Sequence, residues 1–272
     1  MWSRVLGLAA AAAFVAPSQD PPAPGSASKP DVRALERAFR EQKIRLDVER
    51  GLCSIPVTID VKDDLLEYLL VNPHGAAHES LFVTEVVPSA LNAALLALGV
   101  RPGKNARWVP KEPTPTAEEM RAGAPPFTVQ APEGDGFYLY AGWKQGGEVY
   151  FYRVDDLLRD LETGRGMRRH RWVYLGSRLV HTKKDDPKTS FAADLEGNLV
   201  NVALFEQGNT LLTAALPECL KQTIWLPNAW LIPERGAVVE LVFSRARLAM
   251  PPPALEADLP TVTEDTDGGD GR

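Results

Sequence analysis

The alternation of apolar and polar residues predicts a chain built mainly of short strands. Residues 52–59 and 237–243 are runs of apolar and β-branched residues, which is typical of buried strands. Residues 88–99 carry apolar side chains at helical spacing, with Pro88 at the start and Gly99 at the end. Strands outnumber helices and do not alternate with them. The pattern therefore predicts an α+β fold: a single, mostly antiparallel β-sheet domain with a few short helices.

Two turns rich in glycine or polar residues predict β-hairpins. The first would join strands at residues 65–72 and 78–87 through residues 73–77, which contain both proline and glycine. The second lies within residues 190–205 and would turn at residues 196–198. Strands on both sides of such turns are expected to run antiparallel to each other.

The N-terminal residues have the features of an export signal. Arg4 precedes an apolar run at residues 5–16, and small residues follow at the positions expected for cleavage after Ser18. The run is too short to span a bilayer as a helix, so no stable membrane span is expected once residues 1–18 are removed. Retention of this segment as an anchor is the alternative. The prediction is a periplasmic or secreted protein.

Two further segments have the composition of unpacked chain. Residues 19–30 are rich in proline and serine, which predicts a flexible linker. Residues 251–272 begin with three prolines and continue with acidic residues, which predicts a disordered tail that contributes little to the core. The folded domain is thus expected at residues 31–250.

Charge argues against a polyanionic partner. The net charge is −6, and residues 31–250 carry 27 basic against 29 acidic side chains, so this domain has no positive field to hold nucleic acid. One basic cluster stands out, interpreted as a solvated turn, with an anion site as the alternative. It contains Arg165, Arg168, Arg169, His170 and Arg171.

Two cysteines exclude a disulfide-dense scaffold, a four-cysteine zinc site and a cysteine-ligated iron–sulfur cluster. Cys53 and Cys219 are either a disulfide or two buried thiols, and their spacing leaves both possibilities open. No cofactor is predicted. Five tryptophans are interpreted as core and rim packing rather than as a ligand platform. They are Trp108, Trp143, Trp172, Trp225 and Trp230.

The densest polar cluster lies at residues 74–80. Its two histidines, with a glutamate and a serine following, contain groups that bind zinc or act as bases. However, the helical zinc motif is absent, and His78 and Glu79 would point to opposite faces of a strand. We therefore predict no metal site and interpret the cluster as a turn whose polar groups bond to the backbone. Gly176-Ser177 lacks the second glycine of a hydrolase nucleophile elbow.

The same cluster resembles the YdjY domain of exported bacterial proteins. That family has Gly-x-x-His-Glu-Ser, found here at residues 75–80, followed by a helix ending in Leu-Gly. The similarity continues at residues 172–177, 194–198 and 232–239, and covers most of residues 44–243. The resemblance implies export and the extent of the domain. It implies no reaction, because the family has no established activity. Some relatives carry extra cysteines suggestive of iron–sulfur binding, which this chain lacks.

The matched positions define a candidate binding site without assigned catalytic residues. They are Gly75, His78, Glu79, Ser80, Gly176, Ser177, Asp194 and Asn198. The first functional hypothesis is a non-catalytic binding or scaffolding module of the cell envelope, whose partner is an envelope protein or a cell-surface polymer. The alternative is a hydrolase or metal-dependent enzyme centred on the His-Glu-Ser sequence. The sequence alone leaves open whether the chain is an enzyme.

Overall fold

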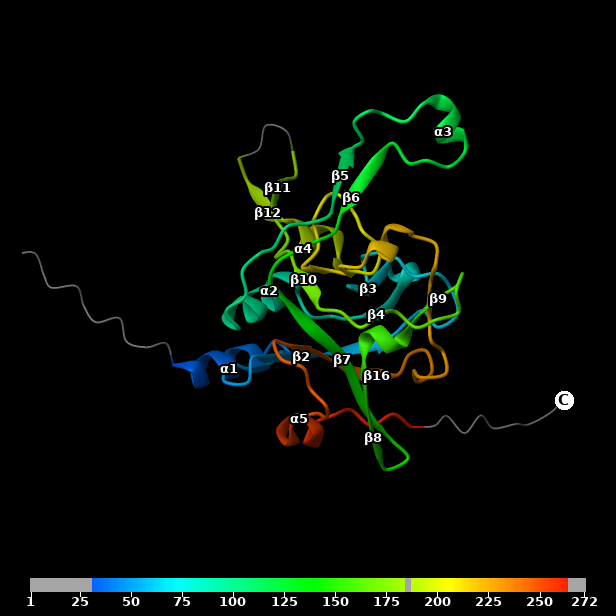
Figure 1. Cartoon of the computed structure of the whole chain (residues 1–272). Coiled ribbons are helices and arrows are strands. Elements are labelled where there is room, and N and C mark those ends of the chain that lie inside the picture. The colour runs from blue at the N-terminus through cyan, green and yellow to red at the C-terminus, as the bar shows by residue number, and fades with distance from the viewer. Residues whose placement is uncertain (1–30, 184–186, 264–272) are drawn as a thin grey trace, which may run out of the picture. The chain divides into compact units, whose positions relative to one another are not determined.

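A closed barrel of eight strands forms the centre of the computed structural model, which describes residues 31–183 and 187–263 (Figure 1). The order of pairing around the barrel is β2 (Leu52–Ile59), β16 (Val238–Ser244), β7 (Gly136–Gln145), β10 (Trp172–Tyr174), β14 (Leu212–Thr213), β13 (Asn198–Asn201), β3 (Tyr68–Val71) and β4 (Ser80–Val83), which pairs again with β2. Neighbouring strands are antiparallel except for β3–β4 and β13–β14.

The fold is therefore mostly β, and the single, mostly antiparallel sheet that the sequence predicts closes into a barrel. Closure depends on β2, whose first residues pair with β1 (Arg45–Asp47) while its last two pair with β4 along the same edge. Similarly, β7 pairs with β10 at its start and with β8 (Glu148–Arg153) further along. Alternation along a strand is the same in open and closed sheets, so the sequence pattern could not distinguish them.

Short elements surround the barrel in the described part of the chain. The α-helices are α1 (Val32–Arg40), α2 (Pro88–Ala97), α3 (Ala117–Arg121), α4 (Ala192–Glu196) and α5 (Pro253–Ala257), and the 3₁₀ helices are η1 (Ala77–Glu79), η2 (Val154–Leu157) and η3 (Pro217–Leu220). Three strand pairs lie outside the barrel: β5 (Arg107–Pro110) with β6 (Phe127–Gln130), β9 (Leu158–Asp160) with β15 (Trp225–Pro227), and β11 (Leu179–His181) with β12 (Thr189–Phe191). In Figure 1, β5, β6 and α3 form an arm that projects from the barrel.

Alternate residues of the long strands fill the barrel interior. On β16, Val239, Leu241 and Phe243 are fully buried in the main core, whereas Val242 belongs to a second apolar cluster. This period of two is that of a strand covered on both faces, one by the barrel interior and one by elements packed outside it. The outer cover of β16 includes Leu255 from α5.

The C-terminal segment packs where its composition predicted an unpacked tail. Leu255 and Leu259 are only 2% and 4% exposed. Beyond them, the N–H of Val262 donates to the carbonyl of Lys144 on β7, 2.8 Å away. The prediction of a disordered tail is therefore wrong for residues 251–263, because two leucines four positions apart anchor an otherwise polar segment. The remainder, residues 264–272, lies outside the described residues.

Neither of the two expected hairpins forms. Strands β3 and β4 are parallel, with Tyr68 opposite Ser80, so residues 72–79 run back along the barrel instead of turning tightly. In the second case, residues 192–196 form α4, while β12 and β13 join different partners. The predicted signal peptide and linker lie outside the described residues. Within the described ranges, no helix has the length and apolar character needed to cross a membrane.

Candidate functional site

The matched residues fall into two groups, one near each end of the segment that joins β3 to β4. At one end of the segment, Gly75 meets the turn between α4 and β13. At the other end, His78 and Glu79 form most of η1. The residues of the sequence-predicted site therefore do not form a single constellation.

Gly75 stands where two backbone segments nearly touch. A Cβ at this position would lie 2.6 Å from the carbonyl oxygen of Gly197, so only glycine fits without a shift. Beside it, the N–H of Asn72 donates to that same carbonyl, and the N–H of Ala76 donates to Oδ1 of Asn198 at 3.0 Å. Gly75 and Asn198 thus fasten the β3–β4 connection to the start of β13.

Asp194 joins three elements through its carboxylate and backbone. Its Oδ1 accepts the N–H of Ser89 at 2.8 Å, in the first turn of α2. That helix has no cap from its own N-cap side chain, so the carboxylate both satisfies a free donor and faces the positive end of the helix. Nε2 of His74 lies 3.2 Å from the Asp194 carbonyl, on the β3–β4 connection.

Gly176 and Ser177 hold the start of α4. Both have positive φ angles, 77° and 56°. The hydroxyl of Ser177 donates to the carbonyl of Asn209 and accepts the N–H of Ala193, the second residue of α4. This hydroxyl is engaged on both sides by the backbone, so it is not placed as a nucleophile.

The His-Glu-Ser residues diverge in direction and environment. Ser80 is fully buried, and its hydroxyl donates to the carbonyl of Phe82 at 2.9 Å. His78 is exposed and Glu79 half-buried, and neither side chain bonds to another described residue. The interpretation that the polar groups of this turn bond to the backbone therefore holds for Ser80 and His74 but is wrong for His78 and Glu79, because η1 turns them outward.

Carboxylates gather around Tyr68 next to η1. Burial raises the pKa of Glu67, the Glu79 carboxylate raises it further, and His78 opposes the rise. Burial also raises the pKa of Tyr68 to about 12, with smaller contributions from nearby glutamates. The ring of Tyr68 stacks on Phe205 with centroids 5.2 Å apart. This side of η1 therefore combines acidic groups with a half-buried aromatic pair.

A cleft of about 540 Å³ opens on the side of His78, and we call it the rim cleft. Backbone pairing builds it: the N–H of Val61 donates to the carbonyl of Ser80, and the N–H of Gly236 to that of Ile59. These bonds bring the chain after β2, the end of η1 and the chain before β16 together. The lining residues are Asp60, Val61, Lys62, Asp63, Asp64, His78, Ala229, Glu234 and Arg235.

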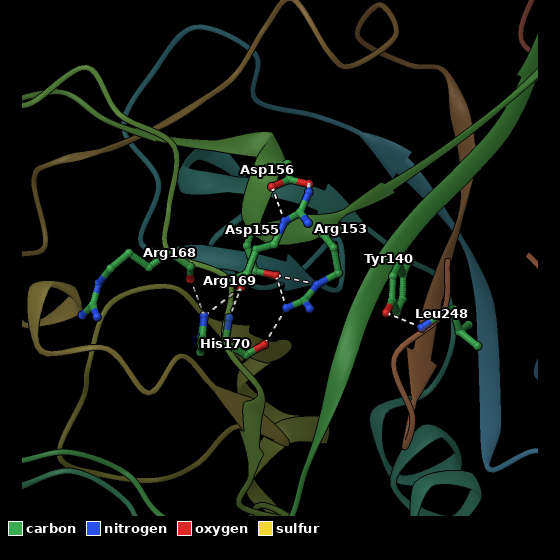
Figure 2. Close-up of polar contacts among 8 residues, drawn as sticks. All are labelled: Tyr140, Arg153, Asp155, Asp156, Arg168, Arg169, His170 and Leu248. Carbon is green, nitrogen blue, oxygen red and sulfur yellow. Dashed lines mark hydrogen bonds and ion pairs between the residues drawn. The ribbon is translucent and has the colours of Figure 1, made fainter. Parts of the chain in front are cut away.

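A buried charged network, absent from the sequence predictions, lies at the end of β8 (Figure 2). Asp155 is fully buried; its Oδ1 lies 2.7 Å from Nδ1 of His170, and its Oδ2 accepts from Nε and Nη2 of Arg153. Burial alone would raise the pKa of Asp155, but the hydrogen bonds and charges of His170 and Arg153 hold it below its ordinary value. The sequence signal was Arg153-Val-Asp155 at a strand end.

The imidazole of His170 is held for packing rather than for proton transfer. Its Nδ1 faces two acceptors, the Asp155 carboxylate and the carbonyl of Arg168. Its Nε2 is buried without a hydrogen-bond partner among the described residues, and the ring packs against Trp172 with centroids 4.9 Å apart. No described nucleophile hydrogen-bonds to it.

Two arginines of the basic cluster around His170 form ion pairs with carboxylates. Arg168 forms a two-bond pair with Glu218, and Arg169 forms one with Asp156. The interpretation of this stretch as a solvated turn is therefore wrong for His170. Arg168 and Arg169 face acidic partners instead of an open anion site, and Arg171 donates to the carbonyl of Gly134. Their matching carboxylates are distant in sequence, which hid the pairing.

Both cysteines are free, fully buried thiols in separate elements. Burial raises the pKa of the Cys53 and Cys219 thiols, which suppresses the reactive thiolate. Among the described residues, no group of three or more histidine, cysteine, aspartate or glutamate side chains is arranged to hold a metal ion.

Comparison with known families gives a match over most of the chain. The family model of the YdjY domain matches residues 44–244, which span the barrel from the end of α1 to the end of β16. The chain belongs to the YdjY domain family. No curated protein and no solved structure gives a match. The YdjY domain boundary stops before α5, so the packed C-terminal segment is an addition to the matched region.

Proposed function

We propose that this YdjY-domain protein is exported to the periplasm or secreted, and there binds or scaffolds another envelope component without catalysing a reaction. Export rests on the basic and apolar N-terminal residues followed by small residues at positions 16–18. The partner is an envelope protein or a cell-surface polymer.

The proposal rests on one observation: most polar residues of the family pattern form hydrogen bonds within the fold. Asp194, Asn198 and Ser177 each accept a backbone N–H from another segment, and the Ser80 hydroxyl donates to a buried carbonyl. A catalytic group must reach the reacting atoms of a substrate, and these groups are already engaged within the fold. Of the matched side chains, His78 and Glu79 make no such bond, and His78, which lines the rim cleft, is free to meet a partner.

The alternative, an enzyme centred on the His-Glu-Ser sequence, retains one supporting observation. Glu67 has a raised pKa beside Glu79 and His78, and paired carboxylates with shifted pKa values are common in hydrolases. Such an enzyme would use Glu67 with Glu79, because Ser80 is buried. A metal-dependent form would show stoichiometric metal that is lost in His78→Ala.

Incubation of the full chain with isolated bacterial envelopes separates these functions. We expect saturable retention of the protein that stays constant over hours and releases no soluble fragments. Glu79→Gln should leave that retention within about twofold, since the change removes charge next to Glu67 but keeps the side chain's size. Failure of the protein to sediment with envelopes would contradict binding. Release of fragments that Glu79→Gln abolishes would establish the enzyme instead.

A further inference from the structure

The rim cleft presents hydrogen-bonding groups that the fold itself leaves available. Lys62 pairs with Glu234 at 2.8 Å, and Arg235 pairs with Asp60 at the same distance. By contrast, Asp63 and His78 form no bond with another described residue. The cleft thus offers open acceptor and imidazole groups beside two fixed ion pairs.

The charge of the cleft limits what it can hold. Four carboxylates line it against one lysine and one arginine, so the cleft is acidic when His78 is neutral. An anionic ligand would be repelled by the aspartates that have no cationic partner. The ligand that fits is therefore neutral or positively charged.

Trp230 gives this region an aromatic surface in full contact with water. The residue directly follows Ala229, which lines the cleft, and its relative exposure is 96%. Trp143, Trp172 and Trp225 are buried, so the interpretation of all five tryptophans as packing residues is wrong for Trp230. A tight turn, in which the N–H of Leu231 donates to the carbonyl of Asn228, holds this ring outward.

We propose that the rim cleft and Trp230 bind a polysaccharide that carries no acidic groups, with one pyranose ring stacked on Trp230 and the hydroxyls of another unit of the same chain, held in the cleft, bonded to His78 and Asp63. A pyranose has one apolar face and a ring of hydroxyls. These are the two kinds of surface that an exposed indole and open carboxylate and imidazole groups complement. The inference rests on the proposed binding function and names its ligand class.

The surroundings of Trp230 favour a sugar over a protein partner. A protein interface centred on tryptophan has a desolvated apolar core around it. Here the lining of the adjoining cleft is polar except for Val61 and Ala229. The exposed ring of Trp230 and the polar groups of the rim cleft suit a hydrated polysaccharide, because its repeating units can contact both.

Calorimetric titration of the full chain with neutral hexasaccharides of glucose, mannose and N-acetylglucosamine tests the inference. We expect at least one to bind, Trp230→Ala to bind about tenfold more weakly, and Trp230→Phe to retain most of the affinity. Hyaluronate hexasaccharide, which carries carboxylates, should bind more weakly than the N-acetylglucosamine hexamer. Asp63→Asn should narrow that difference.

Leu179→Ala is the matched control, because Leu179 is 66% exposed and its strand, β11, contributes nothing to the cleft lining. It should leave both affinity and melting temperature unchanged, and Trp230→Ala should also keep the melting temperature. Absence of binding by all three neutral sugars would overturn the inference. So would retention on envelopes that needs Trp230 but is abolished by protease treatment of the envelopes; that result would indicate a protein partner and leave the proposed function standing.

Discussion

A chain ending at Met250 is expected to melt about 10 °C or more below the full-length protein. The truncation removes Leu255 and Leu259, which are almost completely buried against the outer face of β7 and β16. Each buried leucine contributes ~1.5–3 kcal/mol, and their loss also exposes the surface beneath them. For a domain of this size, each kcal/mol shifts the melting temperature by about 2–4 °C. Differential scanning calorimetry measures the shift.

A chain ending at Thr263 is the control for this truncation. It keeps α5, both leucines and the ion pair between Arg45 and Asp258, so its melting temperature should stay close to that of the full chain. Equal melting temperatures for all three chains would show that the segment after β16 adds nothing to stability. That result would contradict the packing described for Leu255 and Leu259.

Replacing Asp155 with alanine should cost about 3–5 kcal/mol of unfolding free energy. The carboxylate is buried and accepts from two neighbours, Arg153 and His170, whose side chains are only 10% and 8% exposed. Its removal leaves a buried guanidinium without its partner, which is far more costly than losing a solvent-exposed pair. Urea unfolding monitored by tryptophan fluorescence gives the value.

Asp156→Ala provides a neighbouring control. Its partner Arg169 is 63% exposed, so loss of this pair should cost about 1 kcal/mol or less. A cost for Asp155→Ala no greater than for Asp156→Ala would refute the network's role. Both variants keep the remaining contacts of η2 that their backbones form.

The effect of Asp155→Ala should depend on pH. Because the pKa of Asp155 is lower in the folded protein than its ordinary value of about 3.9, the folded state binds fewer protons than the unfolded state near that pH. The stabilisation is therefore complete above about pH 4 and is lost as the pH falls through the lowered value. The difference between wild type and variant should narrow over that acidic range.

Strand positions could be predicted from the sequence because they depend on local alternation. Residues 52–59 coincide with β2, and the helix expected at residues 88–99 matches α2 closely. The direction of pairing could not be predicted in the same way. The connection before β4 runs back along the barrel through the contact of Gly75 with Gly197, which lies more than a hundred residues away.

The candidate site shows the same limit. The family pattern includes Asp194 and Asn198, but the backbone N–H groups that they accept, those of Ser89 and Ala76, are brought close only by the fold. The sequence did not show which tryptophans are exposed, because the exposed Trp230 and the buried Trp225 both have apolar residues on each side. The C-terminal segment was predicted to be disordered because its average composition is polar and acidic. That average hid Leu255 and Leu259, the two leucines that pack against the barrel.

Apart from His78 and Glu79, the polar residues of the YdjY pattern hold segments of the fold together, and the free energy of unfolding of Asp194→Ala measures this contribution. Removing the carboxylate leaves the N–H of Ser89 without its acceptor at the start of α2, so we predict a loss of about 1–2 kcal/mol. The control is Leu195→Ala, because Leu195 follows Asp194 in α4 and its side chain is exposed. This variant should change the free energy of unfolding by no more than about 0.5 kcal/mol. Residues that serve catalysis are often replaced without loss of stability. An Asp194→Ala protein as stable as wild type, or more stable, would therefore contradict this structural role of Asp194.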